Sequence, residues 1–133
     1  MTTTIPATLA QRFEIGDMLA SGNTGSTYQV REHATGRIGV LKLVHVASAW
    51  TAAERGRLGR ELDKLATLRH AYLPEVYATG VVEETPWVFR VEVEGNSLRD
   101  YLSEGPVPGA LSIATQLASA LDEMHRSGLL QRD

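Results

Sequence analysis

The hydrophobic period of this sequence changes near residue 51, and this change limits the possible folds more than any other feature. Before it, apolar residues come in short stretches separated by turn-forming residues, which is typical of β-strands. From Thr51 to Arg69, leucines recur at steps of three and four, the spacing of one face of a helix. These leucines are Leu58, Leu62, Leu65 and Leu68. After Pro74 the strand-like pattern returns, so the sequence predicts an α+β fold.

Five stretches have the composition of β-strands. They are residues 13–20, 27–31, 38–46, 75–82 and 87–93. A glycine-containing turn joins the first two stretches, and an acidic turn at residues 83–86 joins the last two. Hairpins are the simplest connections of this length, so we expect one five-stranded antiparallel sheet.

Two helices are expected after the sheet. Ser97 is placed to cap a short helix that runs through Tyr101. A loop rich in proline and glycine at residues 105–109 precedes a longer helix, which Gly128 should end. One face of this longer helix is apolar and consists of Ala114, Leu117, Leu121 and Met124.

The composition argues against several classes of function. With a formal net charge of −3, the chain has no general basic face, so we expect neither nucleic acid nor a membrane as a partner. It contains no cysteine and its 4 histidines lack the spacing of metal ligands, so no metal site is expected. The apolar runs are too short to cross a bilayer and the first residues do not resemble a secretory signal, which favours a cytoplasmic location.

A lysine and a glutamate are the first candidates for chemistry. Lys42 lies in the apolar third strand, where a cation is costly unless it is paired or meets a ligand. Glu61 on the predicted helix can supply the pair, and a cation held in this way can bind the oxygens of a nucleotide. Alternatively, Lys42 lies at a sheet edge and extends its amine into water.

Two further candidates are the glycine-rich turn and the last residue. Gly22 and Gly25 allow backbone N–H groups to approach a phosphate, but a tight hairpin explains the same residues and is the preferred interpretation. Asp133 can act as a base toward a hydroxyl group, or it is simply a chain end without a role.

Taken in order, these segments resemble the motifs of the bacterial, eukaryotic-type Ser/Thr protein kinases. Residues 19–28 resemble the glycine-rich loop, residues 39–42 (GVLK) the V-A-I-K motif, and Glu61 the glutamate of helix C. Residues 86–98 resemble the fifth strand, the hinge and the start of helix D. Residues 124–133 resemble the end of helix E and the H-R-D motif.

The resemblance implies a protein-kinase-like N-lobe at residues 12–93, after a flexible arm at residues 1–11. Residues 94–133 would contain the hinge exit, helices D and E and the start of the catalytic loop, which is only part of a C-lobe. ATP and magnesium are the implied cofactors. The implied catalytic positions are Lys42, Glu61 and Asp133. The implied nucleotide-binding residues are Ala20, Gly22, Gly25, Thr27, Val40, Lys42, Arg90, Glu92 and Val93.

Several residues depart from the family pattern. Thr27 and Val40 stand where the family has a valine and an alanine, and the extra methyl groups of Val40 would crowd the adenine slot. Arg90 stands at the gatekeeper position, where it either pairs with Glu61 or turns outward to solvent. Gln131 replaces the histidine of H-R-D, and the sequence stops before the family's two magnesium ligands. We therefore expect no phosphate transfer from this chain alone.

Two functions of different classes follow from these observations. In the preferred one, the chain is a pseudokinase-like module that binds and regulates a protein without catalysis. In the alternative, it is the ATP-binding N-terminal fragment of an active Ser/Thr protein kinase. The apolar face of the long helix lacks the C-lobe that covers it in the family, so it needs other cover. We expect a protein partner or a second copy there, ahead of packing against the chain's own sheet. The expected interface residues are Ala114, Leu117, Leu121 and Met124.

Overall fold

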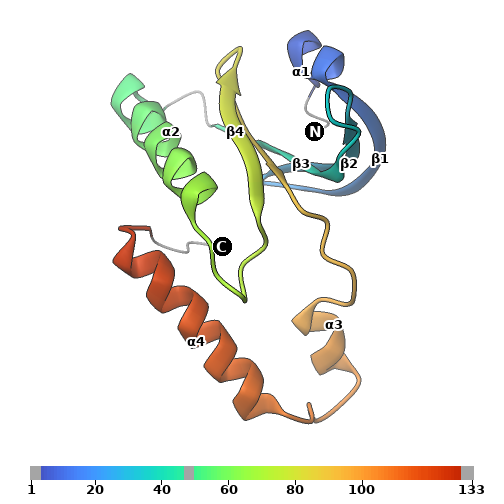
Figure 1. The fold of residues 1–133 in the computed structure, drawn as a ribbon, viewed down its shortest axis with the longest axis vertical. Coiled ribbons are helices and arrows are strands. Elements are labelled where there is room, and N and C mark those ends of the chain that lie inside the picture. Colours follow the sequence, from blue (N-terminus) through green and yellow to red (C-terminus); the bar gives the residue numbers. More distant parts are fainter. Residues whose placement is uncertain (1–3, 47–49, 130–133) are drawn as a thin grey trace.

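One five-stranded antiparallel sheet forms the centre of the molecule, with the strand order β1-β2-β3-β5-β4 (Figure 1). The structure is a computed structural model that describes residues 4–46 and 50–129. The strands are β1 (Phe13–Gly22), β2 (Gly25–Glu32), β3 (Ile38–Val44), β4 (Val76–Val82) and β5 (Thr85–Arg90). The α+β class and the antiparallel five-stranded sheet agree with the sequence prediction.

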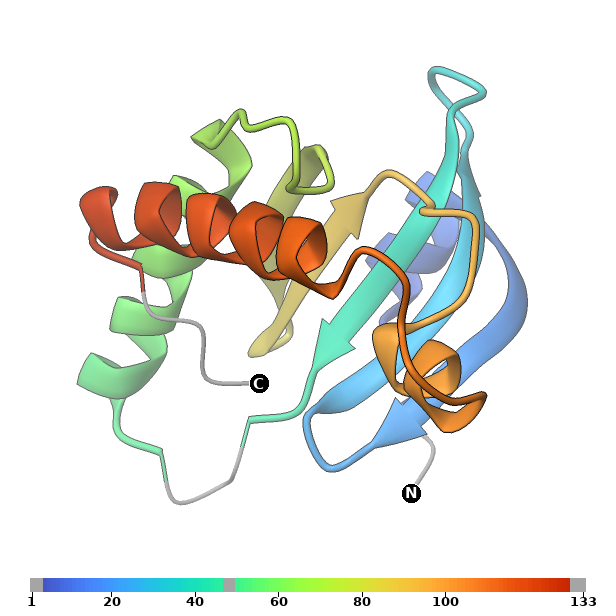
Figure 2. The same ribbon diagram turned by 90° about the horizontal axis from the view of Figure 1, so that it is seen from below.

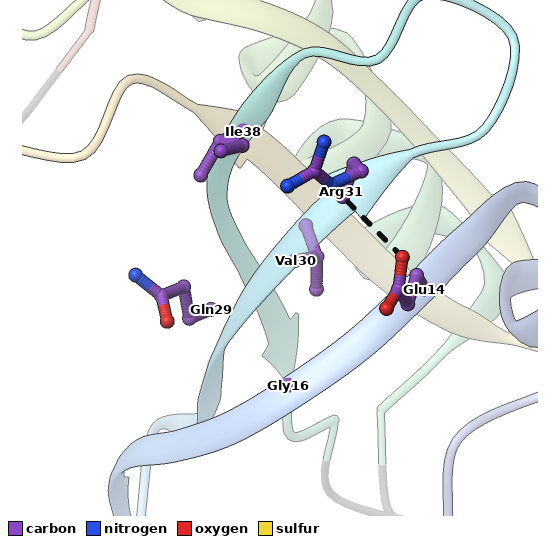
Figure 3. Close-up of a pocket in the computed structure, with 6 residues that line it drawn as sticks. All are labelled: Glu14, Gly16, Gln29, Val30, Arg31 and Ile38. Atoms are coloured by element: carbon purple, nitrogen blue, oxygen red, sulfur yellow. Dashed lines mark ion pairs between the residues drawn. The ribbon is translucent and has the colours of Figure 1, made fainter.

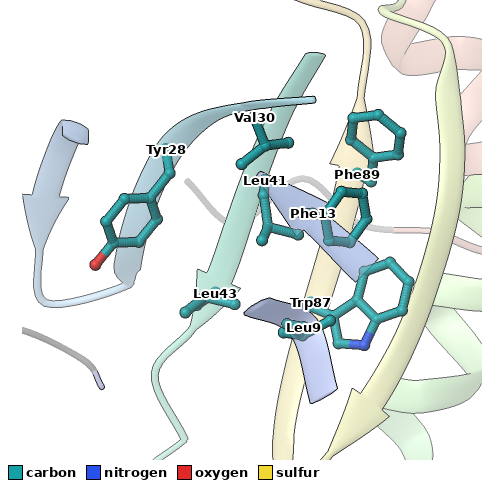
Figure 4. Close-up of a cluster of buried hydrophobic side chains, with 8 residues drawn as sticks. All are labelled: Leu9, Phe13, Tyr28, Val30, Leu41, Leu43, Trp87 and Phe89. Atoms are coloured by element: carbon teal, nitrogen blue, oxygen red, sulfur yellow. The ribbon is translucent and has the colours of Figure 1, made fainter. Parts of the chain in front are cut away.

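The larger hydrophobic core lies on one face of the sheet (Figure 4). Side chains alternate between the two faces of a strand, so Leu41 and Leu43 of β3 reach this core while Lys42 points to the opposite face. Phe13 packs edge-on against Phe89, with ring centroids 4.9 Å apart. The buried members of the core are Leu9, Phe13, Tyr28, Val30, Leu41, Leu43, Trp87 and Phe89.

A short helix, α1 (Ala7–Arg12), precedes the first strand. Its Leu9 is only 2% exposed because it packs into the larger core, and Ile5 packs against the same cluster. The predicted flexible arm at residues 1–11 is therefore wrong for the part of this segment that the structure describes. A helix of 6 residues is too short to give a hydrophobic period, so the sequence pattern did not reveal it.

A partly buried ion pair joins the end of α1 to β2. The guanidinium of Arg12 donates from Nε and Nη2 to Oε2 of Glu32, at 3.0 and 2.8 Å. The hydroxyl of Thr35 donates to Oε1 of the same carboxylate at 2.8 Å. The Thr35 hydrogen bond has the largest effect on the pKa of Glu32 and lowers it. Burial, the next largest cause, raises the pKa, but the hydrogen bond and charge of Arg12 add to Thr35, so the pKa lies below its usual value.

The second helix, α2 (Ala52–Thr67), covers the other face of the sheet, next to β4 and β5 (Figure 1). It begins with a capping box: Thr51 Oγ1 accepts from the backbone N–H of Glu54, whose carboxylate accepts from that of Thr51. The predicted leucine face packs against the sheet. This second cluster contains Leu62, Val76 and Val88, with Leu58, Leu65 and Ala66 around them.

Two further helices lie at one end of the molecule. Ser97 caps α3 (Leu98–Ser103), as predicted, and a loop leads from there to α4 (Ala110–Arg126). The long helix α4 lies beside the end of α2, as both views show (Figures 1 and 2). Nε2 of His70, in the loop after α2, lies 3.0 Å from Oγ of Ser119 on α4. Within the described ranges, no helix has the length and apolar character needed to cross a membrane.

A two-residue turn joins β4 to β5. Val82 pairs with Thr85, which leaves Glu83 and Glu84 as the turn, with φ angles of 49° and 62°. Both angles lie in the left-handed region, where glycine and asparagine are preferred. Arg55 of α2 reaches the turn and donates from Nη1 to Oε1 of Glu84 at 3.0 Å. The hairpin is thus tied to the first turn of α2.

Candidate functional site

The register of the sheet brings most of the predicted nucleotide-binding residues to one face. Opposed residues of an antiparallel pair point to the same side. Thr27 opposes both Ala20 and Lys42, and Val40 opposes Arg90. Lys42 also opposes Val88, which packs toward α2. The face that α2 partly covers therefore carries Ala20, Thr27, Val40, Lys42 and Arg90.

The glycine-rich turn is a tight hairpin. Gly22 pairs with Gly25, so the two strands remain paired up to a turn of two residues. A Cβ atom on Gly25 would collide with the backbone carbonyl of Leu43, so the approach of β3 alone requires glycine there. The tip is also fixed, because the N–H of His45 donates to the carbonyl of Thr24 at 3.1 Å. The preferred hairpin interpretation is confirmed, and phosphate binding by this turn stays a prediction.

A cavity of about 380 Å³ lies between the sheet, α2 and α4. Lys42, Glu61 and Arg90 all line it, so the structure brings together the cation, the carboxylate and the unusual arginine. Among the ion pairs of the residues that the structure describes, none joins Lys42 to Glu61, although Glu61 is engaged in another interaction. The expected cation–carboxylate pair is therefore not formed in this arrangement.

Within the described residues, Arg90 neither forms an ion pair with Glu61 nor turns fully outward to solvent, the two arrangements that the sequence predicts for it. Its guanidinium donates from Nη1 to the backbone carbonyl of Val91 at 3.1 Å, and no ion pair within the described ranges joins it to Glu61. It does not turn fully to solvent either, because the side chain is half-buried and lines the cavity. A backbone carbonyl, which sequence patterns do not display, satisfies one of its donors.

The segment after β5 is held to β2 by a side-chain hydrogen bond. Nε2 of Gln29 on β2 donates to both carboxylate oxygens of Glu92, at 3.0 and 3.3 Å, and Val93 is 63% exposed. Val40 is only 2% exposed, so its side chain is packed on the predicted adenine face. The sequence analysis missed Gln29, although its alternation with Thr27 along β2 places both on this face.

A second, smaller pocket contains none of the predicted site residues (Figure 3). Its volume is about 190 Å³, and its lining includes the ion pair of Glu14 and Arg31. The nearest atoms of that pair are 4.0 Å apart and both side chains are more than half exposed, so water screens their attraction.

The apolar face predicted on the long helix is divided in the structure. Leu117 and Leu121 are 51% and 36% exposed, and Ala114 is exposed beside them. Met124 instead lines the cavity against α2. The structure therefore leaves three of the four predicted interface residues open and turns the fourth inward.

The predicted base Asp133 and the unusual Gln131 lie outside the residues that the structure describes. Within the described ranges, no group of three or more histidine, cysteine, aspartate or glutamate side chains is placed to hold a metal ion.

The chain is similar in sequence and structure to bacterial protein kinases. It is 30% identical over 137 aligned positions to the serine/threonine-protein kinase PknB of Mycobacterium leprae, an alignment that covers 98% of this chain. It is 32% identical over 126 positions to the serine/threonine-protein kinase PknF of Mycobacterium tuberculosis. Its fold matches the PknI kinase domain of M. tuberculosis with a TM-score of 0.79 and 29% identity, over 92% of this chain. The chain is a homologue of the bacterial Ser/Thr protein kinases.

This homologue has the fold of a kinase-domain fragment, namely an N-lobe with part of a C-lobe. It spans 22% of the length of the PknB relative, 26% of the PknF relative and 51% of the solved PknI domain. No family model matches the chain. The family resemblance and the fold class inferred from the sequence are confirmed.

Proposed function

We propose that this kinase homologue is a non-catalytic module that binds another polypeptide through α4. The observation that carries this proposal is the arrangement of Lys42, Glu61 and Arg90 in one cavity, while the ion pairs of the described residues include none between Lys42 and Glu61. Protein kinases need this lysine and glutamate paired for phosphoryl transfer. A second cation beside Lys42 also competes for the same carboxylate, which disfavours the pair further.

The described residues fit the phosphate end of ATP better than its adenine end. Lys42 is half-buried on the predicted nucleotide face and, within the described ranges, has no carboxylate partner. Its ammonium group can therefore donate hydrogen bonds to phosphate oxygens. When bound, magnesium and ATP would supply the phosphoryl group and the charge that neutralises it. On the adenine side, the buried side chain of Val40 occupies the face of the sheet, and the carboxylate of Glu92 accepts a hydrogen bond from Gln29. Both features leave less room and fewer free polar groups for adenine.

The binding surface in this proposal is the exposed stripe of α4. Leu111, Leu117 and Leu121 recur at helical spacing with Ala114 between them, and Leu111 is 82% exposed. Such a stripe is self-complementary when two copies pair in antiparallel fashion about a twofold axis. We therefore assign a second copy of this chain as its first partner.

Sedimentation velocity of the purified chain at micromolar concentration tests the binding surface. We expect a concentration-dependent dimer that Leu117→Glu with Leu121→Glu converts to a monomer. Gln116→Glu is the matched control, because it adds a charge to an exposed position outside the stripe. A wild-type chain that stays monomeric at every concentration, or a dimer that the double variant leaves intact, contradicts the proposed surface.

A second candidate is the ATP-binding part of an active Ser/Thr protein kinase. The shared face of Ala20, Thr27, Val40 and Lys42 and the names of the relatives favour it. Thermal unfolding with and without magnesium-ATP separates the two. An increase in melting temperature that depends on magnesium and is lost in Lys42→Met supports ATP binding. No increase supports the non-catalytic module.

A further inference from the structure

The lining of the cavity between the sheet, α2 and α4 is mostly apolar, which nucleotide binding does not explain. Fourteen of the residues that the structure describes line it, of which three are ionisable and the other eleven are apolar. Its volume of about 380 Å³ falls at the lower end of the range for small-molecule sites. Lys42 and Arg90 carry two positive charges and Glu61 one negative charge, so the ionisable residues of the lining leave an excess of one positive charge.

The two cations and most of the leucines come from different elements, although Glu61 also lies on α2 and three valines of the lining lie on the strands. Lys42 and Arg90 come from β3 and β5 on the sheet. The leucines come mainly from α2 and the loop after it, and Met124 comes from α4. A bound molecule that matches this wall has an apolar body toward the helices and a negative group toward the sheet.

We propose that this cavity binds an apolar monocarboxylic acid of about ten carbons. The carboxylate pairs with Arg90 and Lys42, because a guanidinium binds a carboxylate through two hydrogen bonds and a lysine adds a point charge. The hydrocarbon chain packs among Leu62, Leu65 and Met124. Glu61 lies in the same lining and disfavours a doubly charged ligand, so one negative charge matches the site better than two.

Arg90 is the residue that makes this site selective. Its donor Nη1 is used by the Val91 carbonyl, and the remaining donors of the planar guanidinium are available to a ligand on the cavity side. An uncharged side chain in its place would leave an apolar cavity with Lys42 alone. The proposal needs neither nucleotide nor dimer, so it stands independently of the function proposed above.

Isothermal titration calorimetry of the purified full chain with decanoate, below its micellar concentration, tests the site. We expect saturable binding of one decanoate per chain. Octanoate should bind roughly tenfold more weakly, because two buried methylene groups are lost. Decanol, which has the same hydrocarbon chain without the charge, should bind at least tenfold more weakly. Equal affinity for decanol and decanoate, or no saturable binding, overturns the proposal.

Variants then assign the binding to this cavity. Arg90→Leu and Lys42→Met should each weaken decanoate at least tenfold and leave decanol unchanged. Arg60→Leu is the matched control, because Arg60 is exposed on α2 and outside the cavity lining. Unchanged decanoate affinity in both cavity variants overturns the assignment. If either variant fails to fold in a thermal melt, the comparison of ligands on the wild-type chain still decides the outcome.

Discussion

Replacing Glu32 by alanine should destabilise the chain by about 2 kcal/mol. A hydrogen bond to a charged group contributes about 1.5–3 kcal/mol in a buried setting. The Arg12 side chain is 43% exposed, so solvent screens its two bonds and we assign them about 1 kcal/mol together. The bond from Thr35 to the same carboxylate is 2.8 Å long, but Thr35 itself is exposed, so we assign it about 1 kcal/mol, below that range.

Thermal unfolding followed by circular dichroism measures this loss. Unfolding entropy is about 2.1 cal/mol/K per residue, so for 133 residues a loss of about 2 kcal/mol corresponds to a fall in Tm of about 7 °C. Glu14→Ala is the matched control, because its pair with Arg31 is 4.0 Å long and exposed. The control should lower Tm by less than about 2 °C. Equal changes in both variants would refute the role given to the Arg12–Glu32 pair.

The pH dependence of the same pair has a defined sign. The pKa of Glu32 is lower in the folded chain than its usual value of 4.5. Its contribution is therefore complete above that value and is lost as the pH falls through the lower, folded-state pKa. The Tm difference between wild type and Glu32→Gln should be constant from pH 7 to pH 5 and shrink at more acidic pH. A difference that grows on acidification would contradict the assigned direction.

Three further predictions concern the turn, the second core and the exposed stripe. Replacing Glu83 by asparagine and Glu84 by glycine should stabilise the chain by about 1 kcal/mol, because both positions have positive φ angles. Urea unfolding measures this gain. If no gain is found, the ion pair of Arg55 with Glu84 contributes more than the backbone strain costs. In the same assay, Leu62→Ala should lower the unfolding free energy by about 3 kcal/mol, because Leu62 is only 8% exposed between α2 and the sheet. A loss below about 1 kcal/mol would mean that α2 is loosely packed against the sheet. At a concentration where the chain is monomeric, Leu117→Gln should change the stability by less than about 0.5 kcal/mol, because Leu117 is 51% exposed in the single chain. A larger loss in the monomer would show that Leu117 packs within the chain and is not available to the proposed dimer.

The parts of the fold that the sequence predicted are those with a repeated pattern. Successive side chains of a strand point to opposite faces, so the strand assigned to β3 already places Lys42 on the face opposite to Leu41 and Leu43. The leucine spacing of α2 and the Ser97 cap of α3 are equally local signals. A pattern of this kind needs several turns or strand residues, and the short helix α1 offers too few.

The site was less predictable because its geometry depends on contacts between segments that are distant in sequence. Arg90 was expected to choose between Glu61 and solvent, but the carbonyl of Val91 satisfies one of its donors instead. Gln29 was missed because its partner Glu92 is 63 positions away and Gln29 itself lies outside the family motifs. Met124 was assigned to the open face of α4, yet the helix turns it toward α2.

The distance between Lys42 and Glu61 follows from the packing of α2 more than from their mutual attraction. Burial of Leu62 alone contributes about 1.5–3 kcal/mol, whereas a pair of partly exposed charges contributes about 0–1 kcal/mol. The Arg55–Glu84 pair adds a tether at the other end of the helix. A ligand that fills the cavity next to Leu62 and Leu65 would therefore act on the position of α2 directly, and Glu61 would move with the helix relative to Lys42 on β3.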